Sequence, residues 1–238
     1  AGTPFQRSAV EGLSLTVGAG EFLGIIGHTG SGKSTLIQHL NGLLQPTSGR
    51  ILLDGEDITA LSITERARRG ISYAFQQPVR FKGLRVGDLM NLAAGKDANI
   101  AEVCAYLSEV GLCARDYIDR ELDASLSGGE LKRIEIAMVL ARGTALSVFD
   151  EPEAGIDLWS FQNLIRVFEK MYEQTRGSIL IISHQERILN IADTIVLLKD
   201  GRLAECGPRE EVLPRLLRNI DTAPPVCSML SDPIKEVR

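Results

Sequence analysis

The sequence predicts an α/β protein built on a mainly parallel β-sheet, with a small antiparallel β-subdomain and an inserted α-helical subdomain. Short apolar runs, typical of buried parallel strands, alternate with segments of helical periodicity. Between residues 86 and 122 the apolar residues follow helical spacing, which indicates a group of helices inserted between strands. An Asp-Gly pair follows a strand-like run at 54–55 and again at 200–201, and each pair predicts a tight turn.

The N-terminal half is expected to hold four strands and one helix. Residues 13–17 alternate apolar and polar side chains, as a half-buried strand does, and residues 21–26 form a short apolar run typical of a buried strand. A glycine-rich loop follows and leads into a helix at about residues 34–41. The next two strands are expected at 49–53 and 71–75.

The C-terminal half continues this alternation. The helical subdomain is expected at about 82–142, and its last helix opens at Ser127 with one apolar face, formed by Leu131, Ile134, Met138 and Ala141. The remaining elements are strands at 146–149 and 179–182, a helix at about 159–173 between them, and a closing hairpin that begins at 195–198. We therefore expect one domain over residues 1–219 and an extended C-terminal tail over 220–238.

The composition argues against several classes of protein. The chain has 26 Lys and Arg residues against 31 Asp and Glu residues, and this net charge of −5, without a dense basic stripe, argues against nucleic-acid binding. The four cysteines show no CxxC spacing, which favours free thiols over a zinc site. No apolar run approaches the ~18 residues of a membrane span. The start lacks a secretory signal and an initiating Met, which indicates a trimmed front, and we expect a cytoplasmic protein without direct membrane insertion.

The strongest local pattern is a glycine-rich loop between a predicted strand and a predicted helix. It satisfies G-x-x-x-x-G-K-[ST], in which glycines let backbone N–H groups turn towards phosphate oxygens. The start of the helix adds unpaired N–H groups and a dipole that favours an anion. In this pattern Lys33 reaches the terminal phosphates and the Ser34 hydroxyl ligates Mg²⁺. The sequence therefore predicts a P-loop NTPase core, with a nucleotide site formed by Gly27, His28, Thr29, Gly30, Ser31, Gly32, Lys33, Ser34 and Thr35.

A second glycine-rich segment precedes the helix that opens at Ser127. Ser127 and Glu130 form an S-x-x-E capping box, and this local role is one interpretation of the segment. An exposed Ser followed by Gly128 and Gly129 at a helix N-terminus is also an anion site, suited to a γ-phosphate held by another subunit. The segment alone leaves both interpretations open.

A third motif completes a family resemblance. The apolar run at 146–149 ends in Asp150 and Glu151, and a buried strand delivers such residues to the carboxyl edge of the sheet, where α/β ligand sites lie. With its three motifs in this order, nearly the whole chain resembles the ATP-binding-cassette (ABC) ATPases. The resemblance implies that Asp150 supports Mg²⁺ and that Glu151 orients and polarises the attacking water.

The same resemblance implies roles for four further residues. Gln76, at the end of the strand predicted at 71–75, resembles the Q-loop glutamine, which senses Mg²⁺ and the water. Asp157 resembles the D-loop aspartate that crosses to the opposite subunit, and His184 follows a strand as the switch histidine does. Family members stack adenine on an upstream aromatic residue. Phe5 is the candidate here, with packing against the small sheet as an equal alternative.

The resemblance implies a head-to-tail dimer that sandwiches two ATP molecules. The P-loop of one subunit would face segment 127–130 of a second copy, or of a paralogous ATPase subunit. In-line attack by water on the γ-phosphate would require Mg²⁺ together with Lys33, Gln76, Glu151 and His184. Hydrolysis would move partner subunits docked at the Q-loop and the helical subdomain. A module that closes on ATP with little turnover is the alternative.

Different parts of the chain resemble two branches of this family. Residues of about 2–49 resemble ATPases of energy-coupling-factor importers, which bind a membrane coupling protein at the inner face of the cell membrane. Segments 75–79 and 128–137 resemble the soluble Suf-type ATPase of iron–sulfur cluster assembly, which binds cluster-scaffold proteins. Glu153 also stands where importers usually carry Thr. We therefore hypothesise a composite chain, natural or engineered, joined near residues 40–50.

Overall fold

A six-stranded sheet forms the centre of the molecule, as seen in a computed structural model that describes residues 8–95, 99–174 and 177–221. The strand order is β10-β9-β1-β8-β7-β4. Neighbouring strands from β9 to β4 are parallel, and β10 pairs antiparallel with β9. The strands are β1 (Phe22–Ile26), β4 (Ile71–Ala74), β7 (Leu146–Asp150), β8 (Ser178–Ile182), β9 (Thr194–Lys199) and β10 (Arg202–Pro208). The predicted mainly parallel α/β sheet is confirmed.

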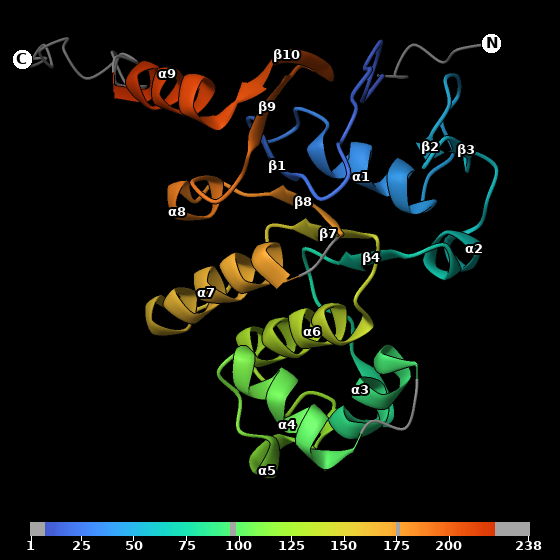
Figure 1. Ribbon diagram of the computed structural model, residues 1–238, viewed down its shortest axis with the longest axis vertical. Helices are drawn as coiled ribbons and strands as arrows, with labels where there is room; N and C mark the ends of the chain where they lie inside the picture. Colours follow the sequence, from blue (N-terminus) through green and yellow to red (C-terminus); the bar gives the residue numbers. More distant parts are fainter. Residues whose placement is uncertain (1–7, 96–98, 175–176, 222–238) are drawn as a thin grey trace, which may run out of the picture.

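Helices cover both faces of this sheet (Figure 1). They are α1 (Lys33–Asn41), α2 (Ile63–Arg68), α6 (Gly128–Arg142), α7 (Leu158–Gln174), α8 (Glu186–Leu189) and α9 (Arg209–Asp221). Successive residues of a strand point to opposite sides. Ile25 of β1 therefore packs in a cluster with Ile37 of α1, whereas Phe22 packs in a second cluster with Ile134 of α6. The helices α1 and α6 thus lie on opposite faces of the sheet.

A largely helical segment joins β4 to α6 and occupies the lower part of Figure 1. Its elements are β5 (Phe81–Arg85), α3 (Val86–Ala94), α4 (Ile100–Glu109), α5 (Ala114–Tyr117) and β6 (Glu121–Leu122). The antiparallel pairing of β5 with β6 joins the two ends of the segment. Its buried apolar residues, such as Val86 and Val103, extend the cluster on the α6 side of the sheet. The inserted helices are present as expected, and the domain limits stay a prediction.

Both predicted Asp-Gly turns are present. Asp54 and Gly55 have φ values of 51° and 82°, and they join β2 (Leu52–Leu53) to β3 (Glu56–Asp57). Asp200 and Gly201, with φ values of 50° and 73°, join β9 to β10. Two successive residues of positive φ match the twist of an antiparallel hairpin, and Asp-Gly tolerates this conformation well.

Some predicted elements were wrong. Residues 13–17 form no strand, because this extended segment pairs with no neighbouring strand. Its apolar side chains instead pack on the α1 side of the sheet. The strand predicted at 49–53 is reduced to β2. The helix α9, which packs on β9 and β10, and the strand pair β5–β6 were not predicted from the sequence. The tail was predicted from residue 220, whereas α9 extends to Asp221, and residues 222–238 lie outside the described residues.

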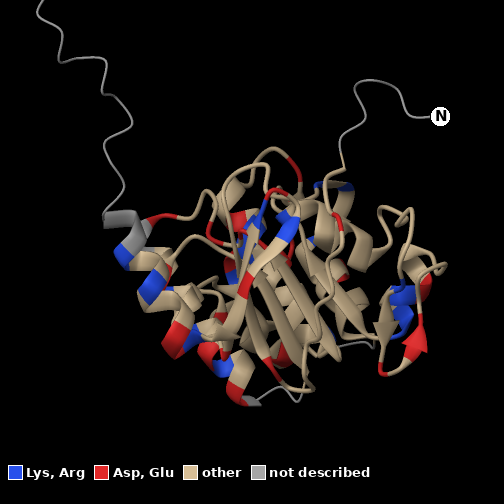
Figure 2. Ribbon diagram, turned by 90° about the horizontal axis from the view of Figure 1, so that it is seen from above, with Lys and Arg blue, Asp and Glu red and all other residues tan. Residues whose placement is uncertain are grey.

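Charged residues surround the sheet. Viewed from above, the strands carry few charges, and Lys, Arg, Asp and Glu are mixed on the helices and loops around them (Figure 2). Within the part of the chain that the structure describes, no helix combines the length and the apolar character needed to cross a bilayer.

Candidate active site

Four loops meet at the carboxyl edge of the sheet. In strand order, β1 leads into the loop at 27–32, β8 into 183–185, β7 into 151–157 and β4 into 75–77. Ligand sites of α/β proteins form at this edge, because adjacent parallel strands deliver distant parts of the sequence to one place. The predicted site residues that meet here are Lys33, Gln76, Asp150, Glu151 and His184.

The P-loop backbone requires glycine at two positions. A Cβ atom at Gly27 would lie 2.3 Å from the carbonyl oxygen of Leu198, and one at Gly32 would lie 2.5 Å from that of Ala9. Both glycines also have positive φ, of 154° and 98°. Gly32 is the N-cap of α1 and places no side chain on the first N–H groups of the helix. These donors therefore remain available to an anion.

The side chains of the P-loop differ in exposure. Ser31 is buried, and its hydroxyl has no hydrogen-bond partner among the described residues. Ser34 and Thr35 are partly buried in the first turn of α1. The part of the loop that faces solvent consists of His28, Thr29 and Gly30.

Lys33 lies inside the loop with only 6% of its surface exposed. Its Nζ donates hydrogen bonds to the carbonyl oxygens of Gly27 (2.6 Å) and His28 (3.0 Å). Burial lowers the pKa of Lys33, and the negative charges of Glu151 and Asp150 oppose this effect. The ammonium group is therefore held between the loop carbonyls and the acidic end of β7.

Asp150, the last residue of β7, provides oxygens suited to a hard cation. Only 2% of the residue is exposed, and its Oδ1 has no hydrogen-bond partner among the described residues. Burial raises the pKa of Asp150, although interactions with the Ser34 and Tyr73 hydroxyls act in the opposite direction. The Tyr73 hydroxyl lies 3.4 Å from Oδ2, a neighbour that the sequence analysis missed.

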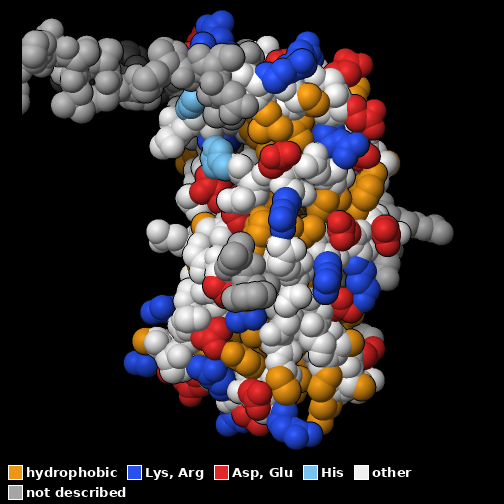
Figure 3. Space-filling view, turned by 90° about the vertical axis from the view of Figure 1, so that its left-hand side faces the viewer, with side chains coloured by type: hydrophobic (Ala, Val, Ile, Leu, Met, Phe, Trp, Pro, Cys, Tyr) orange, Lys and Arg blue, Asp and Glu red, His pale blue; other side chains and the backbone are white. Residues whose placement is uncertain are grey.

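Two side chains flank Glu151. Gln76 Nε2 donates a hydrogen bond to Glu151 Oε2 (2.7 Å), and His184 Nε2 lies 3.4 Å from Oε1. Glu151 has a φ of 46°, a left-handed conformation that residues other than glycine adopt only when the surrounding structure imposes it. Half of the His184 side chain is exposed, and histidine side chains reach the surface beside acidic ones in Figure 3.

The N-terminus of α6 carries the predicted capping box. Ser127 Oγ accepts the N–H of Glu130 (3.2 Å), and the Glu130 carboxylate accepts the N–H of Ser127 (2.7 Å). Hydrogen bonds from the Tyr117 hydroxyl and then from the Ser127 backbone lower the pKa of Glu130 to about 2. Ser127 and Gly128 are exposed, and a Cβ at Gly128 would meet open space. The capping interpretation is confirmed, and the second anion site stays a prediction.

Comparison with known proteins decides the family. Residues 10–154, more than half of the chain, match the ABC transporter family. The chain belongs to this family. It is 40% identical over 216 residues to an uncharacterised ABC transporter ATP-binding protein of Methanocaldococcus jannaschii, which covers 87% of this chain and 86% of that protein. It is 32% identical over 245 residues to the energy-coupling factor transporter ATP-binding protein EcfA2 of Acetivibrio thermocellus. This alignment covers 99% of this chain and 86% of that protein.

Solved structures agree with this assignment. The chain is similar to cbiO1 of Clostridium perfringens, part of the ABC transporter complex cbiONQ, with a TM-score of 0.70 and 28% identity over 90% of this chain and 88% of that one. It is also similar to a bacterial Atm1-family ABC exporter with ATP bound, with a TM-score of 0.78 and 29% identity over 94% of this chain and 41% of that one. The chain is an ATP-binding subunit of the ABC ATPase class.

These comparisons do not support a composite chain. The EcfA2 relative aligns with 99% of this ABC subunit, and so with sequence on both sides of the junction that we predicted near residues 40–50. The resemblance of the later part to Suf-type ATPases finds no support in these relatives either.

Two charged residues of α6 hold the Q-loop backbone of this ABC subunit. Lys132 is fully buried, and its Nζ donates hydrogen bonds to the carbonyl oxygens of Phe75 and Gln76. Glu135 accepts the Phe75 N–H (2.9 Å), and its carboxylate lies 3.6 Å from Lys132 Nζ. Burial lowers the pKa of Lys132 and raises that of Glu135, while their mutual attraction opposes both shifts. This pair was not predicted from the sequence. The clue was a Lys and a Glu three residues apart within a helix whose other face is apolar.

The D-loop (154–157) and segment 127–130, which resembles the signature motif of ABC ATPases and is called the signature segment below, are neighbours within one chain. A Cβ at Gly129 would lie 3.1 Å from the Gly155 carbonyl oxygen. The Asp157 side chain accepts the N–H of Ser160 (2.9 Å) at the start of α7. Its predicted role across a dimer interface stays a prediction. Phe5, the proposed adenine-stacking residue, lies outside the described residues.

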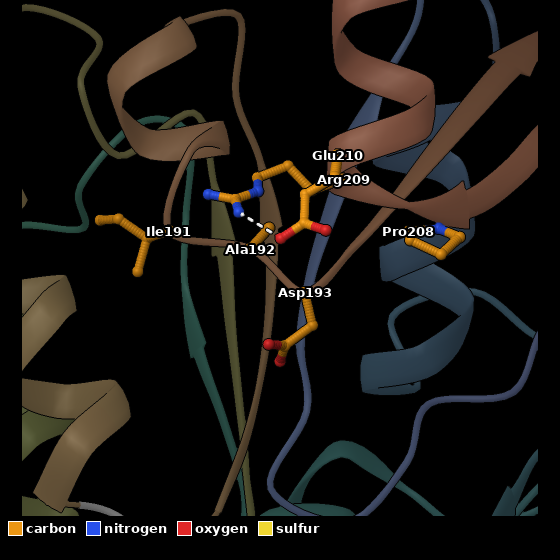
Figure 4. A pocket seen from close by; sticks show the side chains of 6 residues that line it. All are labelled: Ile191, Ala192, Asp193, Pro208, Arg209 and Glu210. Atoms are coloured by element: carbon orange, nitrogen blue, oxygen red, sulfur yellow. Dashed lines mark hydrogen bonds and ion pairs between the residues drawn. The ribbon is translucent and has the colours of Figure 1, made fainter.

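A separate pocket beside Asp193 and Arg209 plays no part in this site (Figure 4). Asp193 accepts the N–H of Phe22, the first residue of β1, and the Tyr172 hydroxyl. The pocket therefore lies at the amino end of β1, whereas the P-loop follows the carboxyl end. These contacts anchor the N-terminal end of β1.

Proposed function

We propose that the chain is the ATP-hydrolysing subunit of an importer of the energy-coupling-factor type. It would work head to tail with a second copy of itself or with a paralogous ATPase subunit. The 99% coverage by the EcfA2 relative supports the importer assignment. The helix α1 begins directly after the P-loop, and α6 begins after Ser127 on the opposite face of the sheet. This separation of the two helix starts supports the dimer, in which each P-loop faces Ser127 of the other subunit. A γ-phosphate on the P-loop is then sealed by Ser127 and Gly129 of the other subunit.

Within each site, the residues of this chain divide the work of hydrolysis. Lys33 exchanges its carbonyl partners for phosphate oxygens and, with the free N–H groups of α1, binds the β and γ phosphates. Glu151 orients the attacking water and accepts its proton. Gln76 and His184 hold the Glu151 carboxylate from both sides.

The residues near Asp150 suit Mg²⁺. Asp150 Oδ1 is buried without a hydrogen-bond partner among the described residues, the Ser34 hydroxyl is a neighbour, and Mg²⁺ prefers such oxygen ligands. Ser34 and Asp150, with Gln76, would hold the ion. When bound, it neutralises negative charge on the transferring phosphoryl group.

An apolar groove beside the Q-loop supplies a docking place for a partner. It has a volume of about 330 Å³, and residues of α2, α3, β5 and α6 line it. Ile63, Val79, Phe81 and Leu92 expose large apolar side chains here. We assign it to an apolar helix of a membrane coupling protein. Such a partner would place the ATPase in the cytoplasm, at the inner face of the cell membrane.

Glu151→Gln tests the proposal by separating ATP binding from hydrolysis. The variant should double in mass on addition of Mg·ATP, measured by light scattering after size exclusion, because it closes on ATP without turning it over. Lys33→Ala in the same background should stay monomeric as the matched control. A Glu151→Gln protein that binds ATP and remains monomeric at saturation would contradict the dimer.

Purification from a host membrane tests the partner class. Recovery of the wild-type chain with an integral membrane protein, dependent on detergent, supports the importer. Recovery in a soluble complex with cluster-scaffold proteins would instead favour the Suf-type alternative. A wild-type chain that dimerises with ATP and releases no phosphate would favour the ATP-gated module.

A further inference from the structure

One carboxylate oxygen holds the loop at 183–185, which carries His184. Glu153 Oε1 accepts a hydrogen bond from the Ser183 hydroxyl (2.6 Å) and another from the His184 N–H (3.2 Å). Ser183 Oγ in turn accepts the N–H of Gln185 (3.0 Å). Three consecutive residues of this loop therefore depend on one side chain from the turn that follows Glu151.

The surroundings of Glu153 make this arrangement costly to maintain. Ser183 is fully buried, so water cannot replace the hydrogen bonds of its hydroxyl. Glu153 Oε2 is also buried and has no hydrogen-bond partner in the described part of the chain. Its charge interacts with the buried ammonium group of Lys132, which also serves Glu135. A small neutral residue would avoid the cost of burying this charge.

The position of the His184 ring depends on its backbone. Half of the side chain is exposed, and its Nε2 faces Glu151 Oε1 at 3.4 Å. We propose that Glu153 is a positioning residue for ATP hydrolysis, which fixes the His184 backbone so that the ring faces Glu151. This inference rests on the proposed function, in which His184 and Glu151 take part in hydrolysis. Glu153 acts through His184 and not on the reacting atoms.

A double-mutant cycle on the full chain tests this role. In single-turnover hydrolysis of Mg·ATP, Glu153→Ala should lower the rate constant by about tenfold or more, because a misplacement of about 1 Å can cost roughly 100-fold in rate. ATP affinity should be unchanged. In the His184→Ala background the same substitution should change the rate less than about twofold, since residues that act as a unit are not additive.

Two further variants separate hydrogen bonding from charge and from folding. Glu153→Gln keeps an acceptor oxygen at the same reach and should restore most of the rate. Ser183→Ala removes one of the two bonds and should give a smaller loss, which also disappears in the His184→Ala background. Glu186→Ala, an exposed acid two residues beyond His184, is the matched control and should hydrolyse ATP at the wild-type rate.

The possible outcomes separate a failure of this inference from a failure of the proposed function. The inference is supported if Glu153→Ala lowers the hydrolysis rate in the wild-type background and not in the His184→Ala background. An equal loss in both backgrounds, or no loss in either, overturns it and leaves the proposed function intact. A His184→Ala protein with the wild-type rate would remove the proposed role of His184, and this inference with it.

Discussion

The two residues that flank Glu151 are held in different ways. Gln76 follows β4, and two charged residues of α6 hold its segment by the main chain. His184 follows β8, and Glu153 holds its segment from the turn directly after β7. The first support therefore comes from the helix that carries the signature segment. The second stays within the edge of the sheet itself.

This difference indicates which side of the site can respond to a partner. The helix α6 lines the apolar groove and begins after the exposed N-cap Ser127, so a shift of α6 carries the backbone of Gln76 with it. Among the described residues, the His184 segment is linked to α6 only indirectly, by the charge interaction of Glu153 with Lys132. We therefore expect the Q-loop to transmit partner binding and subunit closure, while Glu153 keeps His184 in a constant position.

The largest effect is expected at the residue between the two supports. Glu151→Gln should lower kcat by about 100-fold or more, the usual contribution of a positioned general base. Gln76→Ala and His184→Ala should each lower kcat by about tenfold, because each removes one contact to the carboxylate. Steady-state phosphate release at saturating Mg·ATP measures all three. Equal rates for Glu151→Gln and wild type would remove Glu151 as the base.

The α6 support can be broken by removing its buried cation. Lys132→Met should lower the free energy of unfolding by about 3 kcal/mol, because it leaves Glu135 buried and unpaired. Adding Glu135→Leu should recover part of this loss, measured by urea unfolding. ATP hydrolysis should stay low in both proteins, since both lack the hydrogen bonds of Lys132 to the carbonyl oxygens of Phe75 and Gln76. Full recovery of hydrolysis in the double variant would contradict a role in positioning Gln76.

The smallest effect is expected at the N-terminus of α6. Glu130→Ala should lower the free energy of unfolding by about 1 kcal/mol at neutral pH, the typical cost of a lost cap. The folded protein lowers the pKa of Glu130 from 4.5 to about 2. The stabilisation is therefore complete above about pH 4.5 and is lost as the pH falls towards 2. Unfolding curves of both proteins between pH 7 and pH 2 should converge. A constant difference would show that the carboxylate charge contributes nothing.

Much of the edge of the sheet could be predicted from the sequence. The apolar runs predicted β1, β4, β7 and β8, and the ordered motifs placed Lys33, Gln76, Asp150, Glu151 and His184 at their ends. These features are local, since each depends on a few consecutive residues. The Asp-Gly turns were predictable for the same reason.

The supports behind the site were not predictable in this way. Lys132 and Glu135 meet Phe75 from a helix more than fifty residues away, and Glu153 meets Ser183 from thirty residues away. No local pattern predicts such contacts, because tertiary packing creates them. Residues 13–17 show that a local pattern can also predict too much. Their alternating pattern describes which side chains are buried, but it does not show that a partner strand is present.

Mixing two inactive variants tests most directly whether each ATP site combines the P-loop of one subunit with the signature segment of the other. Lys33→Ala damages the P-loop, and Gly128→Asp places a negative charge in the open space at the tip of α6, where its own chain tolerates a side chain. Neither variant alone can form an intact site, because Lys33→Ala does not close on ATP and Gly128→Asp blocks the facing segment, whereas a mixed dimer carries one intact site. We predict that an equal mixture recovers up to roughly a quarter of the wild-type ATPase rate, because random pairing makes half of the dimers mixed and each mixed dimer has one working site of two. A mixture that forms dimers with Mg·ATP and hydrolyses no faster than either variant alone would contradict it.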